Sequence, residues 1–266
     1  PRYGDPPGPR RPPPGADPGT SGPGRQGGAR RRPDRGIHGG TGERRARPPG
    51  LGEVEQIEAE NPALFAQIKQ AIAGGRWHVV NGMVIQPDMN LPAGESFVRQ
   101  VLLGKRYMRA HLGVEPTVAY CVDSFGHAAT LPQILRRCGF DAYVFMRPGP
   151  HEKELPSSIF WWQAPGGSRI LTFRIAGAYT TWDVDQEQHI LQAVAAKPPE
   201  LDATMCFFGV GNHGGGPTKA QIENVLALAE KYHTAAPDLG PDTSPDLEIR
   251  FSWPDAYFGA IHSQAD

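Results

Sequence analysis

The sequence predicts an α/β domain in which parallel strands are covered by helices. From about residue 51 to the C-terminus, segments with helical spacing of apolar residues alternate with short apolar runs. These runs are apolar at nearly every position, which is typical of strands buried on both faces. With 266 residues the chain is long enough for one large domain of this class. The pattern is compatible with a closed barrel and with an open sheet.

Helices are predicted where start and stop residues bracket an apolar period. Asn61 is a suitable cap, Pro62 fits the first helical position, and Gly74 with Gly75 ends that helix. Thr218 is expected to cap a helix near the C-terminus in the same way. The other predicted helices cover residues 94–112, 131–138, 186–196 and 254–261.

Strands are predicted from apolar runs that are bounded by Gly, Pro or polar residues. Residues 117–122 and 142–146 are short runs of the kind found in parallel sheets. Residues 159–162 and 170–175 are typical of a hairpin that turns at Gly166 and Gly167. Further strands are predicted at residues 77–84, 205–210 and 249–252.

The first fifty residues differ in composition from the rest of the chain. They contain eleven Arg, twelve Pro, thirteen Gly and four acidic residues, a net charge of +7, whereas the remainder carries −8. Such a segment buries too little apolar surface to offset the entropy of ordering it, so residues 1–50 are predicted to be disordered and residues 51–266 to form the domain. The segment is either a basic tail or the out-of-frame translation of a GC-rich gene.

The three cysteines and the hydropathy profile exclude several classes of protein. Cys121, Cys138 and Cys206 have no metal-like or redox-like spacing, and each lies in an apolar run, so we expect reduced, buried, inert thiols. No stretch approaches the roughly 18 apolar residues of a membrane span, and no signal-peptide core is recognisable near the start. The sequence therefore predicts a soluble, cytoplasmic protein without a membrane partner.

Two polar clusters follow predicted strands, where the active sites of parallel α/β folds lie. Asp123 directly follows the strand at 117–122, with His127 just beyond it, while Asn212 and His213 lie in a glycine-rich run. An isolated Asp in such a place is more often a helix cap or salt-bridge partner. The glycine run fits a tight turn or a phosphate cradle, although Lys219 does not match the P-loop pattern. Taken alone, these residues indicate an α/β hydrolytic domain with a site near Asp123 and His213.

Several sequence blocks, in order, resemble the family 38 glycoside hydrolases, which are α-mannosidases. The most characteristic are Asp-Ser-Phe-Gly-His at 123–127 and Phe-Trp-Trp at 160–162. Together the blocks span roughly residues 54–262, and their order makes the resemblance specific. The remaining blocks lie at residues 82–88, 90–92, 94–96, 98–100, 104–107, 131–135, 139, 167–169 and 212–218.

The resemblance implies a distorted (β/α)7 barrel, incomplete here, that holds one zinc ion. Asp123 matches the residue that is both nucleophile and zinc ligand, which implies hydrolysis of α-mannosides with retention. The position of Asn212 is often Asp in the family, at or near the general acid, and Asn cannot exchange a proton in that role. His213 is then a candidate acid/base or pocket residue, and His127 a supporting or structural one.

The sequence also departs from the family pattern. Members take two zinc ligands from a His-x-Asp motif on the first barrel strand, and this chain contains no His-x-Asp. A further His ligand lies in a motif beyond the last residue of this sequence, so Asp123 is the only matching zinc ligand. The resemblance thus predicts a domain truncated at both ends and impaired in activity. The expected partner is a carbohydrate, not a specific nucleic acid. Larger relatives often assemble, so the sequence is also compatible with an oligomer.

Two other interpretations remain open on the sequence. A metal-dependent polysaccharide deacetylase also uses an irregular α/β barrel, but paired Asp residues at an early strand end and a His-x3-His spacing are both missing. A non-catalytic fragment or a binding protein could instead use Arg30–Arg32 to attract an acidic partner such as RNA. Salt-dependent binding of nucleic acid that disappears when residues 1–50 are deleted would distinguish this last interpretation.

Overall fold

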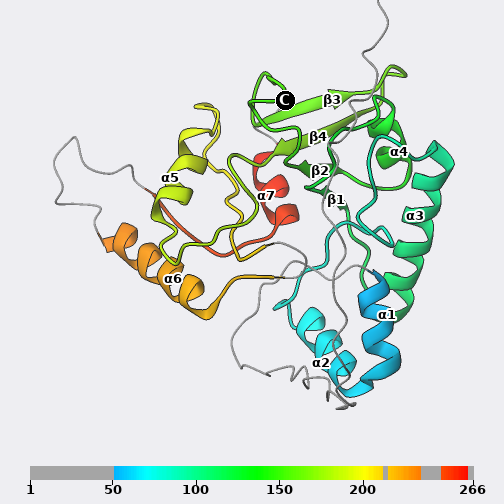
Figure 1. Cartoon of the computed structure of the whole chain (residues 1–266), viewed down its shortest axis with the longest axis horizontal. Coiled ribbons are helices and arrows are strands. Elements are labelled where there is room, and N and C mark those ends of the chain that lie inside the picture. The colour runs from blue at the N-terminus through cyan, green and yellow to red at the C-terminus, as the bar shows by residue number, and fades with distance from the viewer. Residues whose placement is uncertain (1–50, 212–214, 235–246, 263–266) are drawn as a thin grey trace, which may run out of the picture. The chain divides into compact units, whose positions relative to one another are not determined.

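The computed structural model describes residues 51–211, 215–234 and 247–262, which form one sheet with helices around it (Figure 1). Residues 1–50, predicted to be disordered, lie outside the described residues. In chain order the elements are α1 (Leu51–Glu60), α2 (Pro62–Ala73), α3 (Gly94–Tyr107), a π-helix (Met108–Leu112), β1 (Val118–Cys121), α4 (Leu131–Arg137), β2 (Ala142–Phe145), β3 (Ile159–Gln163), β4 (Arg169–Arg174), α5 (Glu187–Ala195), α6 (Lys219–Thr234) and α7 (Pro254–Ile261).

The sheet has the strand order β1-β2-β4-β3. Strands β1, β2 and β4 are parallel, with Val118 opposite Ala142 and Ala142 opposite Leu171. Strand β3 pairs antiparallel with β4 and closes the predicted hairpin, in which Ala164 N–H donates to the Ser168 carbonyl at 2.8 Å. The predicted α/β class is therefore confirmed, and the strands within the described residues form an open four-stranded sheet.

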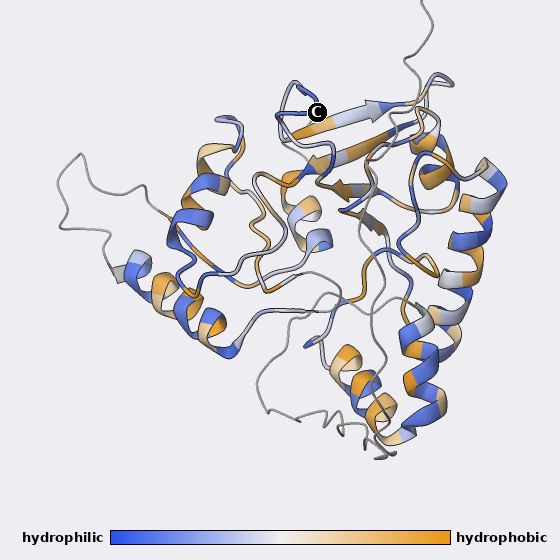
Figure 2. Cartoon of the chain, viewed as in Figure 1, coloured by the Kyte–Doolittle hydropathy of each residue, from blue (hydrophilic) through white to orange (hydrophobic). Residues whose placement is uncertain are grey.

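Both faces of the sheet are covered at its parallel strands β1 and β2, which explains why these two strands are apolar at every position. On β1, Val118 and Tyr120 belong to one buried cluster, and Ala119 and Cys121 belong to the other. The first cluster includes side chains of α7, and the second includes side chains of α3 and α4. In Figure 2 the central strands are accordingly mostly orange. A third cluster joins α1 and α2 to the π-helix.

The predicted helix ends are confirmed where a cap fixes them. The Asn61 side chain accepts a hydrogen bond from Leu64 N–H at 3.1 Å, and Pro62 is the first residue of α2. At the start of α6, Thr218 Oγ1 accepts from Gln221 N–H at 3.1 Å, while Gln221 Oε1 accepts from Thr218 N–H at 2.9 Å. This reciprocal pair satisfies two backbone amides that the helix itself leaves without partners.

Three predicted strands are wrong. Residues 77–84 form no ladder because Asn81 and Gly82 both have left-handed backbone, with φ of 80° and 65°, so that only Asn81 N–H reaches β1, at the Val118 carbonyl. In residues 205–210 the carbonyls have partners other than a neighbouring strand. The Phe207 carbonyl accepts from the His189 side chain, and the Gly209 carbonyl accepts from Thr181 N–H in the loop after β4. Residues 249–252 have no strand partner among the described residues.

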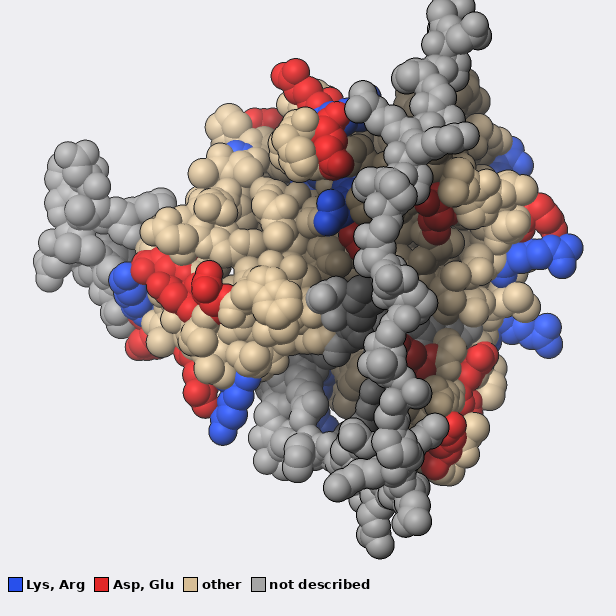
Figure 3. Space-filling view, viewed as in Figure 1, with Lys and Arg blue, Asp and Glu red and all other residues tan. Residues whose placement is uncertain are grey.

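Two properties concern the surface and the helices of the described part. None of its helices combines the length and the apolar character that crossing a membrane requires. On the face shown in Figure 3, basic and acidic side chains are scattered between uncharged areas and do not gather by sign.

Candidate functional site

Asp123 lies at the carboxyl end of β1, as predicted. The pairing of β1 with β2 continues one step past the last strand residues, since Arg147 N–H donates to the Val122 carbonyl at 3.3 Å. Because β1 and β2 are parallel, Asp123 and Arg147 leave the sheet at the same edge. This is the edge at which parallel α/β folds place their active sites.

Asp123 and Arg147 form an ion pair at this edge. Arg147 Nε donates to Asp123 Oδ1 at 2.8 Å, and the two side chains are 36% and 49% exposed. The Arg147 guanidinium also lies over the ring of Phe125, with 5.0 Å between Cζ and the ring centroid. The carboxylate is thus held in one orientation and still reachable from solvent, as a nucleophile must be. Sequence reasoning missed Arg147, although its place directly after an apolar run is the same signal that identified Asp123.

The turn that follows Asp123 is fixed to the segment before α3. Ser124, which is 5% exposed, accepts from Met89 N–H at 2.8 Å through Oγ and donates to the Gly126 carbonyl at 2.9 Å. Ala128 N–H donates to the Met89 carbonyl at 2.8 Å. Just before Met89, Asp88 accepts from two backbone amides, and these bonds lower the pKa of its carboxyl. The turn that carries Asp123 is therefore pre-organised.

His127 lies behind Arg147 and contacts it through the backbone. His127 Nε2 is 2.7 Å from the Arg147 carbonyl oxygen, and Nδ1 is 3.0 Å from the hydroxyl of fully buried Tyr143. A carbonyl only accepts, so Nε2 carries the proton and Nδ1 accepts from the Tyr143 hydroxyl. Burial lowers the pKa of His127, and the bond to Arg147 opposes this effect without cancelling it. His127 thus contacts the backbone of the residue that is paired with Asp123.

The half-buried imidazole of His127 predicts a stability that decreases in acid. Its folded pKa lies below the ordinary value of 6.5, so below that pH the unfolded chain binds a proton that the folded chain does not. Stability present above pH 6.5 is therefore lost as the pH falls toward the folded pKa, by up to about 1.4 kcal/mol for each pH unit. Urea unfolding at pH 7.5 and 5.5 measures this loss.

The matched variant for this measurement is His127→Gln, which has no titrating group at that position. Its free energy of unfolding should change less between the two pH values than that of the wild type. The ion pairs His78–Asp255 and His111–Glu58 are present in both proteins, so they do not contribute to the difference between them. Equal pH dependence in the two proteins would contradict the assignment.

The second predicted cluster is described only at its two ends. Asn212 and His213 lie outside the described residues. Before them, the Gly209 carbonyl accepts from Thr181 N–H at 2.8 Å, and Val210 N–H donates to the Gly216 carbonyl at 3.1 Å. The two described ends of the glycine-rich segment are therefore joined by a hydrogen bond, and the first of them is attached to the loop that follows β4.

The described residues do not form a zinc site by themselves. No group of three or more His, Cys, Asp or Glu side chains among them is arranged to hold a metal. Asp123, the expected ligand, is paired with a cationic guanidinium instead. None of the three cysteines forms a disulfide; Cys121 is buried and the other two are half-buried. Burial raises the pKa of Cys206 to about 12 and also raises that of Cys138, so both are protonated at neutral pH, as expected of inert thiols.

Comparison with known proteins agrees with the architecture and with the sequence motifs. The model of the glycosyl hydrolases family 38 N-terminal domain matches residues 53–266. Alpha-mannosidase G of Dictyostelium discoideum is 30% identical over 210 residues, and human alpha-mannosidase 2C1 is 27% identical over 217 residues. These alignments cover 77% and 80% of this chain but 18% and 20% of the relatives, so the chain spans about a fifth of their length.

A solved structure shows the same fold. The crystal structure of an alpha-mannosidase from Enterococcus faecalis V583 superimposes with a TM-score of 0.61 at 21% sequence identity, covering 81% of this chain and 24% of that one. The family model, the relatives and the fold thus coincide on the region that holds the sheet and Asp123. The chain therefore belongs to glycosyl hydrolase family 38 and matches its N-terminal domain.

Proposed function

We propose that this chain supplies the nucleophile for the hydrolysis of α-mannosides with retention. The observation that carries the proposal is the solvent-reachable carboxylate of Asp123, oriented by Arg147 at the carboxyl edge of a parallel sheet. Family membership and the names of the relatives support an α-mannoside as the substrate. The proposed partner is therefore a carbohydrate.

In the proposed reaction an Asp123 oxygen attacks the anomeric carbon of the mannoside. The bond to the leaving oxygen breaks, and an acid about 5–5.5 Å from Asp123 protonates that oxygen. The resulting glycosyl ester is then cleaved by water, which the same residue activates as a base. Asn212 cannot exchange a proton in this way. We propose His213 either as this acid/base or as a residue that lines the pocket. Arg147 positions the nucleophile in both steps.

We retain zinc as a proposal in which Asp123 is one ligand and the other donors come from outside the described residues. No step above uses the ion. Because the sequence contains no His-x-Asp motif, we propose that this chain alone holds zinc poorly and has impaired activity. We further propose that the four-stranded sheet is part of an incomplete (β/α)7-type barrel. The parallel arrangement of β1, β2 and β4 supports this extension.

The stereochemistry of the product tests the proposed reaction. The purified chain is incubated with an aryl α-mannoside, with and without added zinc, and the first mannose released is followed by proton NMR. Two displacements at one carbon retain configuration, so α-mannose should appear before mutarotation produces the β-anomer. Initial release of β-mannose, or no hydrolysis in either condition, would contradict the proposal for this chain.

Arg147→Met is expected to reduce kcat by roughly a hundredfold, because the nucleophile loses the group that orients it. The ion pair is half exposed, so its loss should change the free energy of unfolding by no more than about 1 kcal/mol. Steady-state kinetics with the aryl α-mannoside and urea unfolding separate the two effects. Arg147→Lys keeps the charge without the planar guanidinium and should fall between the wild type and Arg147→Met.

A further inference from the structure

The loop between β4 and α5 presents Trp182 to solvent. The Trp182 side chain is 67% exposed, and Val184, two residues later, is 53% exposed. The loop leaves the sheet at the carboxyl end of β4, which is parallel to β1 and β2. It therefore starts at the same edge as Asp123 and Arg147. An exposed indole in a loop that starts at this edge needs an explanation, because Trp is usually largely buried.

The backbone on both sides of Trp182 is fixed by hydrogen bonds. Before it, Thr181 N–H donates to the Gly209 carbonyl at 2.8 Å, and Gly209 N–H donates to Thr181 Oγ1 at 3.1 Å. Gln221 Nε2 donates to the Thr181 carbonyl at 3.1 Å and to the Asp183 carbonyl at 2.9 Å. Gln186 Nε2 donates to the same Asp183 carbonyl at 2.6 Å. Both glutamines are buried, with 1% and 0% exposure.

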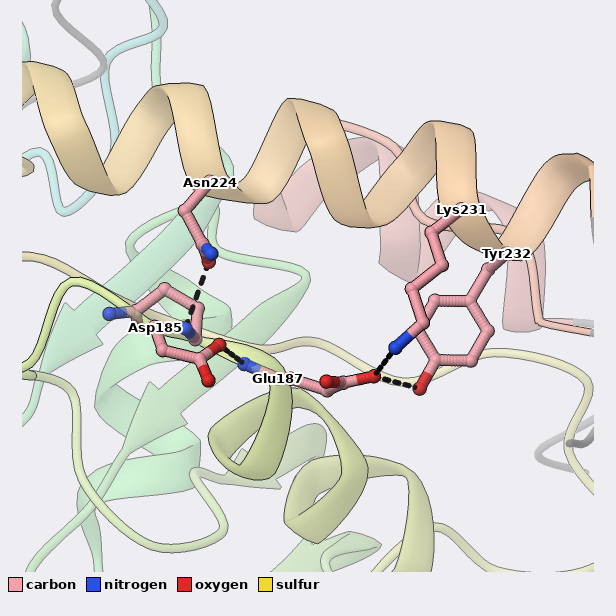
Figure 4. A network of polar contacts seen from close by, with 6 residues as sticks. Asp185, Glu187, Asn224, Lys231 and Tyr232 are labelled. Atoms are coloured by element: carbon pink, nitrogen blue, oxygen red, sulfur yellow. Dashed lines mark hydrogen bonds and ion pairs between the residues drawn. The ribbon is translucent and has the colours of Figure 1, made fainter.

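The two helices behind the loop are tied together as well (Figure 4). Asn224 of α6 accepts from Gln186 N–H at 2.9 Å, and Asp185 accepts from Glu187 N–H at 3.0 Å at the start of α5. Further along α6, Lys231 donates to the Glu187 carboxylate at 2.6 Å and the Tyr232 hydroxyl donates to it at 2.8 Å. The backbone of the loop is thus held by hydrogen bonds, while the Trp182 indole remains exposed to solvent.

We propose that Trp182 is a platform for a sugar ring of the substrate other than the mannose that is cleaved. A pyranose has a face of C–H groups, which packs on an indole, and a rim of hydroxyls, which need polar partners. Around Trp182 the exposed Asp183 and Asp185 and the half-buried Thr180 and Thr181 offer such partners. One exposed indole with one exposed valine nearby is a small apolar surface, which fits a sugar ring better than a protein, whose stable interfaces bury about 800 Å² per partner. Because the loop is already ordered, binding loses little conformational entropy.

The inference rests on the proposed function and is tested by comparing two substrates. α-Mannosyl fluoride contains only the ring that is cleaved, whereas an α-linked mannotriose also reaches beyond it. In Trp182→Ala the ratio of kcat/KM for the triose to kcat/KM for the fluoride should fall about tenfold. Trp182→Phe, which keeps an aromatic face, should recover most of this ratio. Leu226→Ala, which removes another exposed apolar side chain (54% exposed), should leave the ratio unchanged. A ratio that Trp182→Ala does not alter would overturn the platform.

A binding measurement separates this inference from the hydrolytic function. Mannotriose added to the wild-type chain should shift the tryptophan emission, and the shift should be lost in Trp182→Phe, although four other Trp residues remain. If the chain hydrolyses neither substrate but shows this difference, the hydrolytic proposal fails and the platform stands. If the emission of the wild type and of Trp182→Phe responds equally to mannotriose, the platform is wrong, whatever the activity.

Discussion

Asp123→Asn is expected to lower the rate of hydrolysis of an aryl α-mannoside by at least about a thousandfold. The amide cannot form the glycosyl ester, so both steps that depend on this intermediate are lost, and removing a covalent catalyst has effects of this size or larger. The substitution keeps the shape of the side chain, and its oxygen can still accept from Arg147 Nε at the 2.8 Å position. Initial rates and urea unfolding of the same preparation distinguish lost chemistry from lost folding.

The matched control is Asp141→Asn. Asp141 is also paired with an arginine at 2.8 Å, Arg136, but it precedes β2 and is far more exposed, at 71%. Its substitution should leave the rate of hydrolysis unchanged within about twofold, since exposed ion pairs contribute little. Similar losses in the two variants would show that Asp123 has no special role. Hydrolysis that survives in Asp123→Asn would identify another nucleophile.

Gly104→Ala is expected to destabilise the fold by about 3 kcal/mol. A Cβ at Gly104 of α3 would lie 2.4 Å from the Gly82 carbonyl oxygen and 2.8 Å from the Met83 carbonyl carbon. Both are backbone atoms, so the whole segment would have to move away from the helix. The same segment leads to Met89, which anchors the turn behind Asp123. The variant should therefore unfold at lower urea and also lose activity.

Gly259→Ala provides the opposite control for this prediction. Gly259 is also inside a helix, α7, but a Cβ there meets nothing within 4 Å. Replacing a helical Gly by Ala in open space should stabilise the protein by up to about 1 kcal/mol. Urea unfolding curves of the two variants should thus shift in opposite directions. A Gly104→Ala protein as stable as the wild type would mean that the helix and the segment do not approach this closely.

The sequence predicted those parts of the fold whose burial is uniform. Strands β1, β2 and β4 are covered on both faces, so their apolar runs are unmistakable. It failed for residues 77–84, where an equally apolar run turns through Asn81 and Gly82 to approach Gly104. Helix α1 was not predicted because Val54 is its only buried residue among the side chains described there, which leaves no apolar period. Tertiary contacts decided both cases.

For the site, the sequence located the carboxylate but missed its neighbour. Asp123 was recognisable as a polar residue directly after an apolar run. Arg147 is 24 residues away, and it reaches Asp123 only because β1 and β2 are adjacent and parallel. Strand adjacency is a property of the folded sheet, and spacing along the chain does not reveal it. The role of Asn212 and His213 stays a prediction.

Gln221 performs two structural tasks with one side-chain amide. Its oxygen accepts from Thr218 N–H to cap α6, and its nitrogen holds the carbonyls of Thr181 and Asp183. A fluctuation that unwinds the first turn of α6 therefore also weakens the attachment of the Trp182 loop, which then depends on its bonds to Gly209 and Gln186. In terms of hydrogen exchange, the opening of these two segments, almost forty residues apart, is expected to be coupled. The end of a helix thus influences the mobility of a loop to which it is not directly joined.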